Sequence, residues 1–222
     1  MRTGRHEQLA GLTTRLAEAC GMAGRAMRRT TDAMLQTDLA SAERVIIEGE
    51  DISAITRHAH DEAFALLALR AASEQRAIVS SIQLAADVQR MGELAVHVAK
   101  IARRRHPHPV VPAEVRPLFA DMGRFAVELS GGARAVLLWR DPRRVAQIRH
   151  DLDAMNELHQ RSLRVMLDRD WRHGVTAAVD LALLGRFYER FADHAMEIGR
   201  RVIFEATGMH HVAPAVSGLD YA

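Results

Sequence analysis

The distribution of proline constrains the fold of this 222-residue chain more than any other feature. Residues 1–106 and 143–213 contain no proline, whereas four of the six prolines fall between residues 107 and 117. Proline breaks the interior of a helix because it lacks a backbone N–H and its ring clashes with the preceding turn. Two long helical blocks are therefore expected, joined by a linker at about His106 to Pro112.

Neither block shows a pattern typical of β-structure. No segment alternates apolar and polar residues with β-branched enrichment, and no Asn-Gly or Asp-Gly hairpin turn occurs, so the chain is predicted to be all-α. Candidate helix caps are Asp38 and Ser73-Glu74-Gln75 in the first block, and Asp141 before Pro142 and Asp170 in the second. The predicted helices span residues 5–37, 39–71, 74–105, 113–139, 142–169 and 171–206.

An internal repeat relates the two blocks. The last predicted helix carries an apolar seam whose members are alternately three and four residues apart, and the seam recurs 100 residues earlier with Ser81 as its polar exception. The fold is therefore predicted as a tandem repeat of two three-helix bundles, residues 1–106 and 113–208, with a flexible tail at 209–222. The seam of the last helix consists of Leu181, Leu184, Tyr188, Phe191, Ala195, Ile198 and Val202.

A second repeated stripe consists of small residues at seven-residue spacing. Glycine inside a helix costs about 1 kcal/mol relative to alanine, so its recurrence predicts that a neighbouring backbone passes close to this stripe. The six positions are Ala85, Gly92 and Ala99 in the first block and Gly185, Ala192 and Gly199 in the second.

The composition is ordinary for a globular chain, with 48% hydrophobic and 26% charged residues, which excludes intrinsic disorder. The longest uncharged apolar run, Ala63–Leu69, is far shorter than the roughly 18 residues of a membrane helix, so no membrane insertion is predicted. The amino terminus lacks the apolar region of a secretory signal. The protein is therefore expected to be cytoplasmic, with its one cysteine, Cys20, in the core.

The charge distribution argues against a nucleic-acid partner. The net charge is only +2, and the basic residues are spread over all six predicted helices. The densest basic run, Lys100–His106, stands at the end of a predicted helix, where cations complement the helix dipole. A docking or phosphate-binding patch is the alternative interpretation of this run.

An acidic row on the last predicted helix is the strongest candidate for a site. Glu189, Asp193 and Glu197 lie one turn apart, on a face away from the apolar seam. One interpretation is a solvated face balanced by nearby arginines. The other is a set of oxygen ligands for a metal, because carboxylates one turn apart share a cation when a second helix supplies more of them.

Further carboxylates are available to such a metal site from the preceding helix of each block. In the second block these are Asp151, Asp153 and Glu157. In the first block the corresponding row is Gln89, Glu93 and His97, with Glu50 and Asp51 on the helix before it, and this set is poorer in carboxylate.

The sequence offers no convincing catalytic set. It contains no phosphate-cradling P-loop, dinucleotide fingerprint or serine nucleophile elbow, and no His-x3-His pair for zinc. A ferritin-like di-metal carboxylate oxidase is the alternative from the enzyme class, but such sites use paired Glu-x-x-His motifs, and the chain contains none. The protein is therefore predicted not to be an enzyme.

Two segments resemble the signature of the PhoU family, the accessory regulators of phosphate-specific transport. The first is the stretch Tyr188–Ala195, which reads Tyr-Glu-Arg-Phe-Ala-Asp-His-Ala and precedes Arg-Arg-Val-Ile-Phe. The second is Asp87–Ala95, which reads Asp-Val-Gln-Arg-Met-Gly-Glu-Leu-Ala. The resemblance covers nearly the whole chain and implies a tandem three-helix fold.

The resemblance also implies a function and a set of ligands. Family members are implicated in restraining a sensor histidine kinase and the phosphate ABC transporter, as homodimers in the cytoplasm, and several bind iron or zinc through Glu/Asp-x-x-x-Asp motifs. The corresponding ligands in the second repeat are Glu189 and Asp193 with Asp151 and Asp153. In the first repeat, which departs from the family motif, they are Glu93 and Asp51. The predicted partners are therefore the kinase and the cytoplasmic subunits of the transporter, with iron or zinc as the candidate metal.

Overall fold

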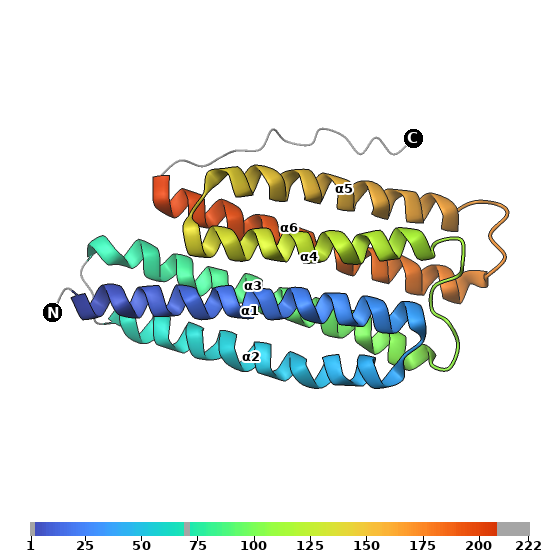
Figure 1. Ribbon diagram of the computed structural model, residues 1–222, viewed down its shortest axis with the longest axis horizontal. Coiled ribbons are helices and arrows are strands. Elements are labelled where there is room, and N and C mark those ends of the chain that lie inside the picture. Colours follow the sequence, from blue (N-terminus) through green and yellow to red (C-terminus); the bar gives the residue numbers. More distant parts are fainter. Residues whose placement is uncertain (1–2, 69–71, 208–222) are drawn as a thin grey trace.

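The computed structural model describes residues 3–68 and 72–207, which form six helices and no strand, and the side chains of residues 3–6 and 72–74 are not described. The helices run along one long axis (Figure 1). The all-α prediction is confirmed. The elements are α1 (Thr3–Gln36), α2 (Leu39–Ala68), α3 (Ala72–Arg105), α4 (Arg116–Trp139), α5 (Pro142–Met166) and α6 (Gly174–Thr207).

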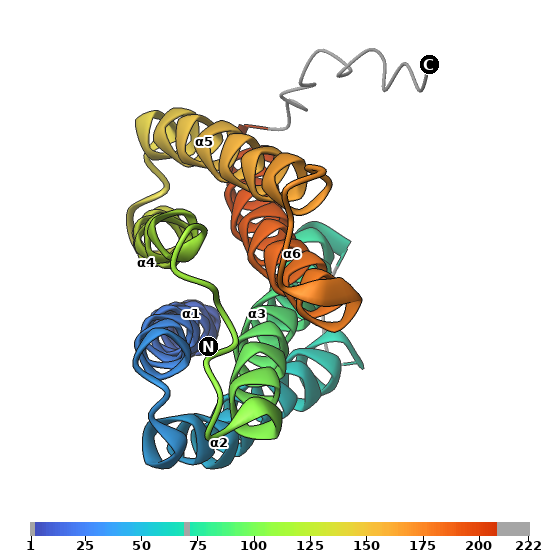
Figure 2. The same ribbon diagram turned by 90° about the vertical axis from the view of Figure 1, so that its right-hand side faces the viewer.

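The helices form two three-helix bundles that pack against each other. α1, α2 and α3 contact one another, and α4 contacts α5 and α6, which also contact each other. In addition α1 packs on α4 and α3 packs on α6, so these four helices form the centre, with α2 and α5 on opposite outer sides (Figure 2). The buried apolar side chains form one connected core. The tandem arrangement is confirmed, and the two bundles share a core despite the proline-rich linker.

The precise limits of the two repeats, residues 1–106 and 113–208, stay a prediction. The predicted flexible tail at 209–222 lies outside the described residues.

Two of the predicted caps are confirmed. The carboxylate of Asp141 accepts a hydrogen bond from the backbone N–H of Arg143 at 3.0 Å, and Pro142 takes the first helical position. Asp38 accepts from the backbone N–H of Ser41 at 3.1 Å, immediately before α2. Each carboxylate satisfies a backbone donor that the first turn of a helix leaves free.

Other predicted boundaries are wrong by a few residues. α4 begins at Arg116 rather than at 113, because Val115 and Arg116 close a turn onto the carbonyl of Pro112. α6 begins at Gly174 rather than at 171, and the φ of +79° at Gly174 is a left-handed conformation that no continuous helix contains. Asp170 is therefore not a cap of α6. The stretch 73–75 lies inside the first turns of α3 rather than before it.

The predicted apolar seam is the buried side of each third helix. All seven seam residues of α6 are buried, and so are their counterparts on α3 apart from the half-buried Ala102. The burial class of residues 75–102 repeats at 175–202 in 21 of 28 positions, including exposed Arg90 and Arg190 and half-buried Glu93 and Asp193. An offset of 100 residues therefore relates the environments in α3 and α6.

The small-residue stripe faces the second helix of each bundle. A Cβ atom added at Gly92 would lie 2.8 Å from Cγ2 of Ile52 on α2, and one at Gly185 would lie 2.6 Å from Cδ2 of His159 on α5. The prediction of a close approach is right, but the wrong partner was expected. The glycines accommodate bulky side chains of the neighbouring helix, not its backbone.

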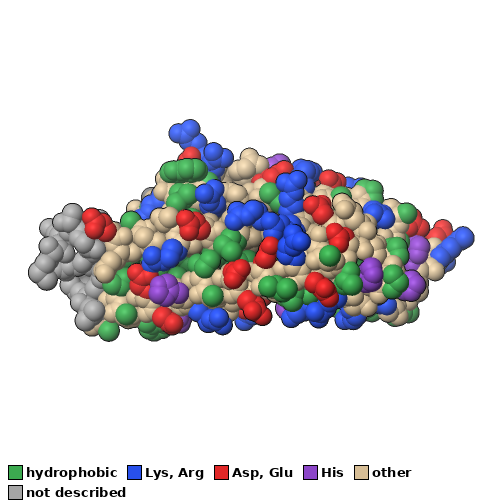
Figure 3. All heavy atoms as spheres, turned by 60° about the horizontal axis from the view of Figure 1, so that its bottom comes forward, with side chains coloured by type: hydrophobic (Ala, Val, Ile, Leu, Met, Phe, Trp, Pro, Cys, Tyr) green, Lys and Arg blue, Asp and Glu red, His purple; other side chains and the backbone are tan. Residues whose placement is uncertain are grey.

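Charges of both signs are intermixed on the surface of the face that Figure 3 shows. That distribution lacks the single-sign patch by which a nucleic-acid binder attracts a phosphate backbone. None of the helices within residues 3–68 and 72–207 is long and apolar enough to cross a membrane.

Candidate functional site

The acidic row of Glu189, Asp193 and Glu197 lies on the outer side of α6. Glu189 borders α5, whereas Glu197 pairs with Arg201, which binds Asp87 of α3. All three residues are half-buried. The helix places them there because the apolar seam and the small-residue stripe direct the other sides of α6 into the core and toward α5. The row is therefore neither fully solvated nor enclosed.

Glu189 is bound by side chains from two helices. Nδ1 of His159 on α5 lies 3.2 Å from its carboxylate, and Arg186 on the preceding turn of α6 forms an ion pair with it. The hydrogen bond from His159, followed by that from Arg186, lowers the pKa of Glu189. Glu189 is thus held as a carboxylate whose charge the protein itself offsets.

Asp193 is in the opposite situation. Burial raises its pKa, and the neighbouring negative charge of Glu189 raises it further. Its nearest cation, Arg190, is 3.8 Å away, and the side chain is 43% exposed. Asp193 is therefore the carboxylate of the row that the protein compensates least, since Glu197 pairs with Arg201 at 2.8 Å.

The carboxylates predicted on α5 are placed differently from each other. Asp151 is buried and accepts a hydrogen bond from Nε2 of Gln147 at 2.8 Å, whereas Asp153 is exposed. α5 and α6 are antiparallel, with His159 beside Gly185 and Ile148 beside Gly199. This register puts Asp151 level with Asp193 along the helix axes.

The corresponding face of the first repeat forms a groove of about 430 Å³ between α2 and α3. Glu93 lines it, but this carboxylate accepts from Nε2 of Gln89 at 2.9 Å and from Arg90 at 2.5 Å. Asp51 is exposed. The other charged groups lining the groove are Glu50, Arg57 and Lys100, so its two carboxylates are matched by two basic side chains.

These donors do not converge on one point. Among residues 3–68 and 72–207, no three His, Cys, Asp or Glu side chains are grouped so that they could hold a metal ion. The row offers Glu189 and Asp193 from a single helix, and His159 and Arg186 occupy Glu189. The side chains as arranged therefore do not supply the full ligand set of iron or zinc, and the metal site stays a prediction.

The structure identifies two buried carboxylates that the sequence analysis did not single out. Asp87 on α3 accepts from Nδ1 of His194 at 3.0 Å and Nε of Arg201 at 3.1 Å, both on α6. Asp180 on α6 is bound by Arg104, at 2.6 Å, and by Arg105 of α3. Both carboxylates join the two repeats, and the basic run at the end of α3 is thus an inter-repeat contact.

The sequence contains only part of the information needed to predict these two contacts. Asp87 stands inside the motif that carries the family resemblance, but sequence does not reveal its partners more than 100 residues away. Asp180 stands beside the seam residue Leu181, which places it at the edge of the predicted core. A carboxylate in such a position is expected to have a cationic partner, because burying an unpaired charge is unfavourable.

Cys20 is buried, as predicted. Its Sγ lies 3.5 Å from the carbonyl oxygen of Ser130, and burial raises the pKa of the thiol to about 12. Because the thiolate is the reactive form, this cysteine is unreactive at neutral pH.

Comparison with known proteins supports the resemblance found in the sequence. The family model described as the PhoU domain matches twice, over residues 16–102 and 119–202. The chain is 58% identical over 210 residues to the Mycobacterium tuberculosis phosphate-specific transport system accessory protein PhoU homolog 2, covering 94% of this chain and 99% of the relative. It is 59% identical to PhoU homolog 1 of Mycobacterium leprae, covering 94% and 95%.

Solved structures show the same fold. A crystal structure of PhoU from Pseudomonas aeruginosa matches with a TM-score of 0.80 at 20% identity, covering 92% of this chain and 99% of that one. The phosphate transport system regulatory protein PhoU from Streptococcus pneumoniae matches with a TM-score of 0.81 at 16% identity, covering 94% and 99%.

Proposed function

The chain belongs to the PhoU family, and from this premise we propose that it is a negative regulator of phosphate uptake and of phosphate-starvation signalling. The observation that carries the proposal is the match of both repeats to the family model, together with 58% identity along 94% of the chain to a relative named as an accessory protein of phosphate-specific transport. These relatives support a role related to phosphate transport.

The regulator acts by contact rather than by catalysis. Its partners are a sensor histidine kinase and the cytoplasmic subunits of the phosphate ABC transporter, and it works in the cytoplasm as a homodimer. The shared core of α1, α3, α4 and α6 supports this mode of action, because it makes the long helices one rigid body that presents extended faces. Membership of an accessory family favours this function over a ferritin-like oxidase or a nucleic-acid binder.

A capture experiment tests the proposed contacts. The tagged full-length protein is purified from its own cells grown in high and in low phosphate, and the co-purifying proteins are identified by mass spectrometry. We expect a histidine kinase and subunits of the phosphate transporter, with more of them captured in high phosphate. Capture of neither partner in both media, with the tagged protein expressed and folded, would contradict the proposal.

A further inference from the structure

An exposed apolar strip lies on the outer side of α6, near its amino-terminal end. Val175, Val179 and Leu183 follow one another at intervals of four residues, so they share one side of the helix over about 12 Å. They are 80%, 52% and 42% exposed. Figure 2 shows α6 beside α3 on one side of the molecule, with α1 and α4 on the other. We call these three residues the α6 strip.

The repeated fold does not require the α6 strip to be apolar. At an offset of 100 residues, the equivalent positions on α3 are Gln75, Val79 and Gln83, and all three are exposed there as well. Two of these positions hold glutamine in the first repeat, where Oε1 of Gln83 accepts a hydrogen bond from Arg201 of α6 at 2.6 Å. Packing within the bundle therefore does not explain why α6 carries apolar residues at these exposed positions.

The strip also differs from the other exposed apolar side chains of the described residues. Ile47 and Phe64 stand four to five turns apart on α2, Val79 and Trp139 stand on separate helices, and Val165 and Leu167 stand only two residues apart, at the end of α5. Single exposed apolar residues are normal on a protein surface, whereas contiguous ones mark an interaction site. The α6 strip is a helix-spaced row of three.

The end of α3 places basic groups beside the strip. Arg105 of α3 reaches the carbonyl of Thr176 at 3.4 Å, so the end of α3 lies beside the strip. There, Arg104 and Arg105 share the single buried carboxylate of Asp180, which leaves one positive charge uncompensated. Lys100, one turn earlier, is exposed as well, but it lines the groove between α2 and α3 together with Glu50 and Glu93.

On α6 itself the exposed charges nearest the strip belong to two arginines, each of which has a carboxylate partner. Between residues 174 and 190 the helix carries two acids and two arginines, Arg186 and Arg190, and both arginines are exposed. Of the acids, Asp180 is buried against α3, and Glu189 faces His159 of α5. Arg186 pairs with Glu189, and Arg190 lies 3.8 Å from Asp193, which is the first half-exposed carboxylate beyond the strip on this side of α6.

We propose that the α6 strip docks an amphipathic helix of a protein partner, a helix whose apolar row is flanked by acidic residues. The apolar row would pack on Val175, Val179 and Leu183, and its carboxylates would lie against Arg104 and Arg105. The strip is then the surface by which this chain contacts one of the partners assigned above, so the inference rests on the proposed function.

A binding measurement with synthetic helices tests the chemistry of the partner. The probe is a fluorescent peptide helix with leucine on one face and glutamate on its flanks, and the matched control peptide has lysine in place of glutamate. We expect the acidic peptide to bind the full-length protein and the basic one to bind at least about tenfold more weakly. Equal binding of the two peptides would overturn the proposal.

Two variants locate the binding on the surface. The double substitution Val179→Asp with Leu183→Asp should weaken binding of the acidic peptide at least about tenfold, whereas Val79→Asp, at the equivalent exposed position of α3, should leave it unchanged. All positions are exposed, and circular dichroism confirms that each variant folds. Unchanged binding to the double variant, or equal loss with Val79→Asp, would overturn the assignment.

Other occupants give different results. If the strip binds a second copy of this chain, the molar mass in solution changes in the double variant but not in Val79→Asp. If it lies on a membrane, the wild type binds vesicles of phosphatidylcholine and phosphatidylglycerol and the double variant does not. Either result would overturn docking of a partner helix.

The capture experiment separates failure of this inference from failure of the proposed function. Loss of kinase or transporter capture in the double variant, with capture retained by Val79→Asp, is the expected result. Normal capture by the double variant would refute the α6 strip as the docking surface and would leave the proposed regulatory function standing. If the wild type captures neither the kinase nor the transporter, the proposed regulatory function itself is refuted.

Discussion

At the scale of single residues, α6 holds two aspartates in opposite electrostatic situations. Asp180 is buried and bound by two arginines of α3, so the fold supplies more positive charge than the carboxylate carries. Asp193 is half-exposed, and burial together with the charge of Glu189 raises its pKa. Ionised Asp180 therefore stabilises the contact between repeats, whereas ionised Asp193 costs folding free energy.

Asp180→Asn should destabilise the protein. The amide keeps the shape of the side chain but weakens the hydrogen bonds from Arg104 and Arg105, and hydrogen bonds to charged groups contribute about 1.5–3 kcal/mol each. Because both arginines are partly exposed and regain water, we expect a total loss of about 1–3 kcal/mol in urea unfolding. Glu157→Gln, at an exposed carboxylate of α5, should stay within about 0.5 kcal/mol. Equal behaviour of the two variants would show that the Asp180 contact is not stabilising.

Asp193→Asn should have a pH-dependent effect of the opposite sign. An acid whose pKa is raised in the folded state is disfavoured as a carboxylate, so at neutral pH the amide variant should be more stable than the wild type. The gain should be at most about 0.5 kcal/mol, because the side chain is 43% exposed and solvent screens it. It should vanish as the pH falls below the ordinary value of 3.8, where Asp193 is protonated in both states. Urea midpoints between neutral and acid pH measure the difference, and a gain that persists in acid contradicts it.

Any bound metal is expected at the second repeat, with ligands from Glu189, Asp193 and Asp151 or Asp153. The double variant Glu189→Ala with Asp193→Ala should then lose the iron or zinc that elemental analysis finds in wild-type protein purified without chelator. Glu93→Ala, on the corresponding face of the first repeat, should change the content less. Unchanged metal in the double variant would exclude these two carboxylates as ligands.

The site residues that the sequence predicted differ from those that it missed in how far along the chain their interaction partners lie. Spacing along one helix placed Glu189, Asp193 and Glu197 on a common side, because that relation is local. The partner of Glu189, His159, stands on another helix, and its position depends on the register of α5 against α6. Spacing within one helix contains no such information, so sequence could not show that the protein offsets this charge itself.

At the scale of helices, the glycines show how closely neighbouring elements pack. A Cβ atom at Gly92 would overlap Ile52 of α2, one at Gly199 would make ordinary contacts of 3.4 Å or more with α5, and one at Gly131 on exposed α4 surface would meet nothing within 4 Å. The three sites form a graded series in the same kind of secondary structure.

Alanine substitutions along this series should change sign. Gly131→Ala should stabilise the protein by up to about 1 kcal/mol through helix propensity alone. Gly199→Ala should be close to neutral or stabilising, and Gly92→Ala should destabilise by about 1–3 kcal/mol, since Ile52 must shift in a packed core. Thermal or urea unfolding of the three variants measures the order. Stabilisation by Gly92→Ala would show that α2 and α3 are not packed as closely as described.

Helix number, order and buried faces were predictable because each depends on local pattern, namely proline placement, the three-four seam and the caps at Asp38 and Asp141. The starts of α4 and α6 were not, since both depend on loop conformation. At α6 the left-handed Gly174 sets the boundary, and glycine in a sequence does not reveal the sign of its φ.

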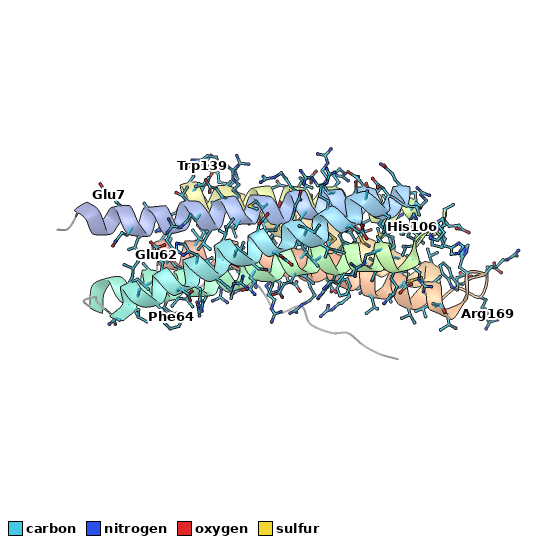
Figure 4. The ribbon with its side chains drawn as sticks, turned by 90° about the horizontal axis from the view of Figure 1, so that it is seen from below. Glu7, Glu62, Phe64, His106, Trp139 and Arg169 are labelled. Carbon is cyan, nitrogen blue, oxygen red and sulfur yellow. The ribbon has the colours of Figure 1, made fainter. Side chains whose placement is uncertain are left out.

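At the scale of the whole molecule, the two repeats act as one body. The shared core joins them through α1, α3, α4 and α6, and Asp87 and Asp180 add polar contacts between α3 and α6. A third contact lies at one end, where His173 of the α5–α6 loop is 3.0 Å from Glu114 of the linker segment. Figure 4 places His106 and Arg169, which flank these two segments, at that same end.

This docking of one repeat on the other could not be predicted from the repeat itself. The seam residues show which side of α3 and α6 is buried, but the same seam would serve two separate bundles. The decision rests on the contacts that α1 makes across the repeats. Sγ of Cys20 lies 3.5 Å from the carbonyl oxygen of Ser130 on α4, and Oγ1 of Thr31 lies 2.6 Å from the hydroxyl of Tyr188 on α6.

The measurement that tests the central claim most directly is the activity of a phosphate-starvation promoter in cells that lack this gene. Relatives include PhoU homologs 1 and 2 in one organism, Mycobacterium tuberculosis, so any second copy is deleted as well. In phosphate-rich medium we expect the promoter to be active in the deletion strain and repressed again when the wild-type gene is restored. A strain without any copy that still represses the promoter normally in high phosphate would contradict the account.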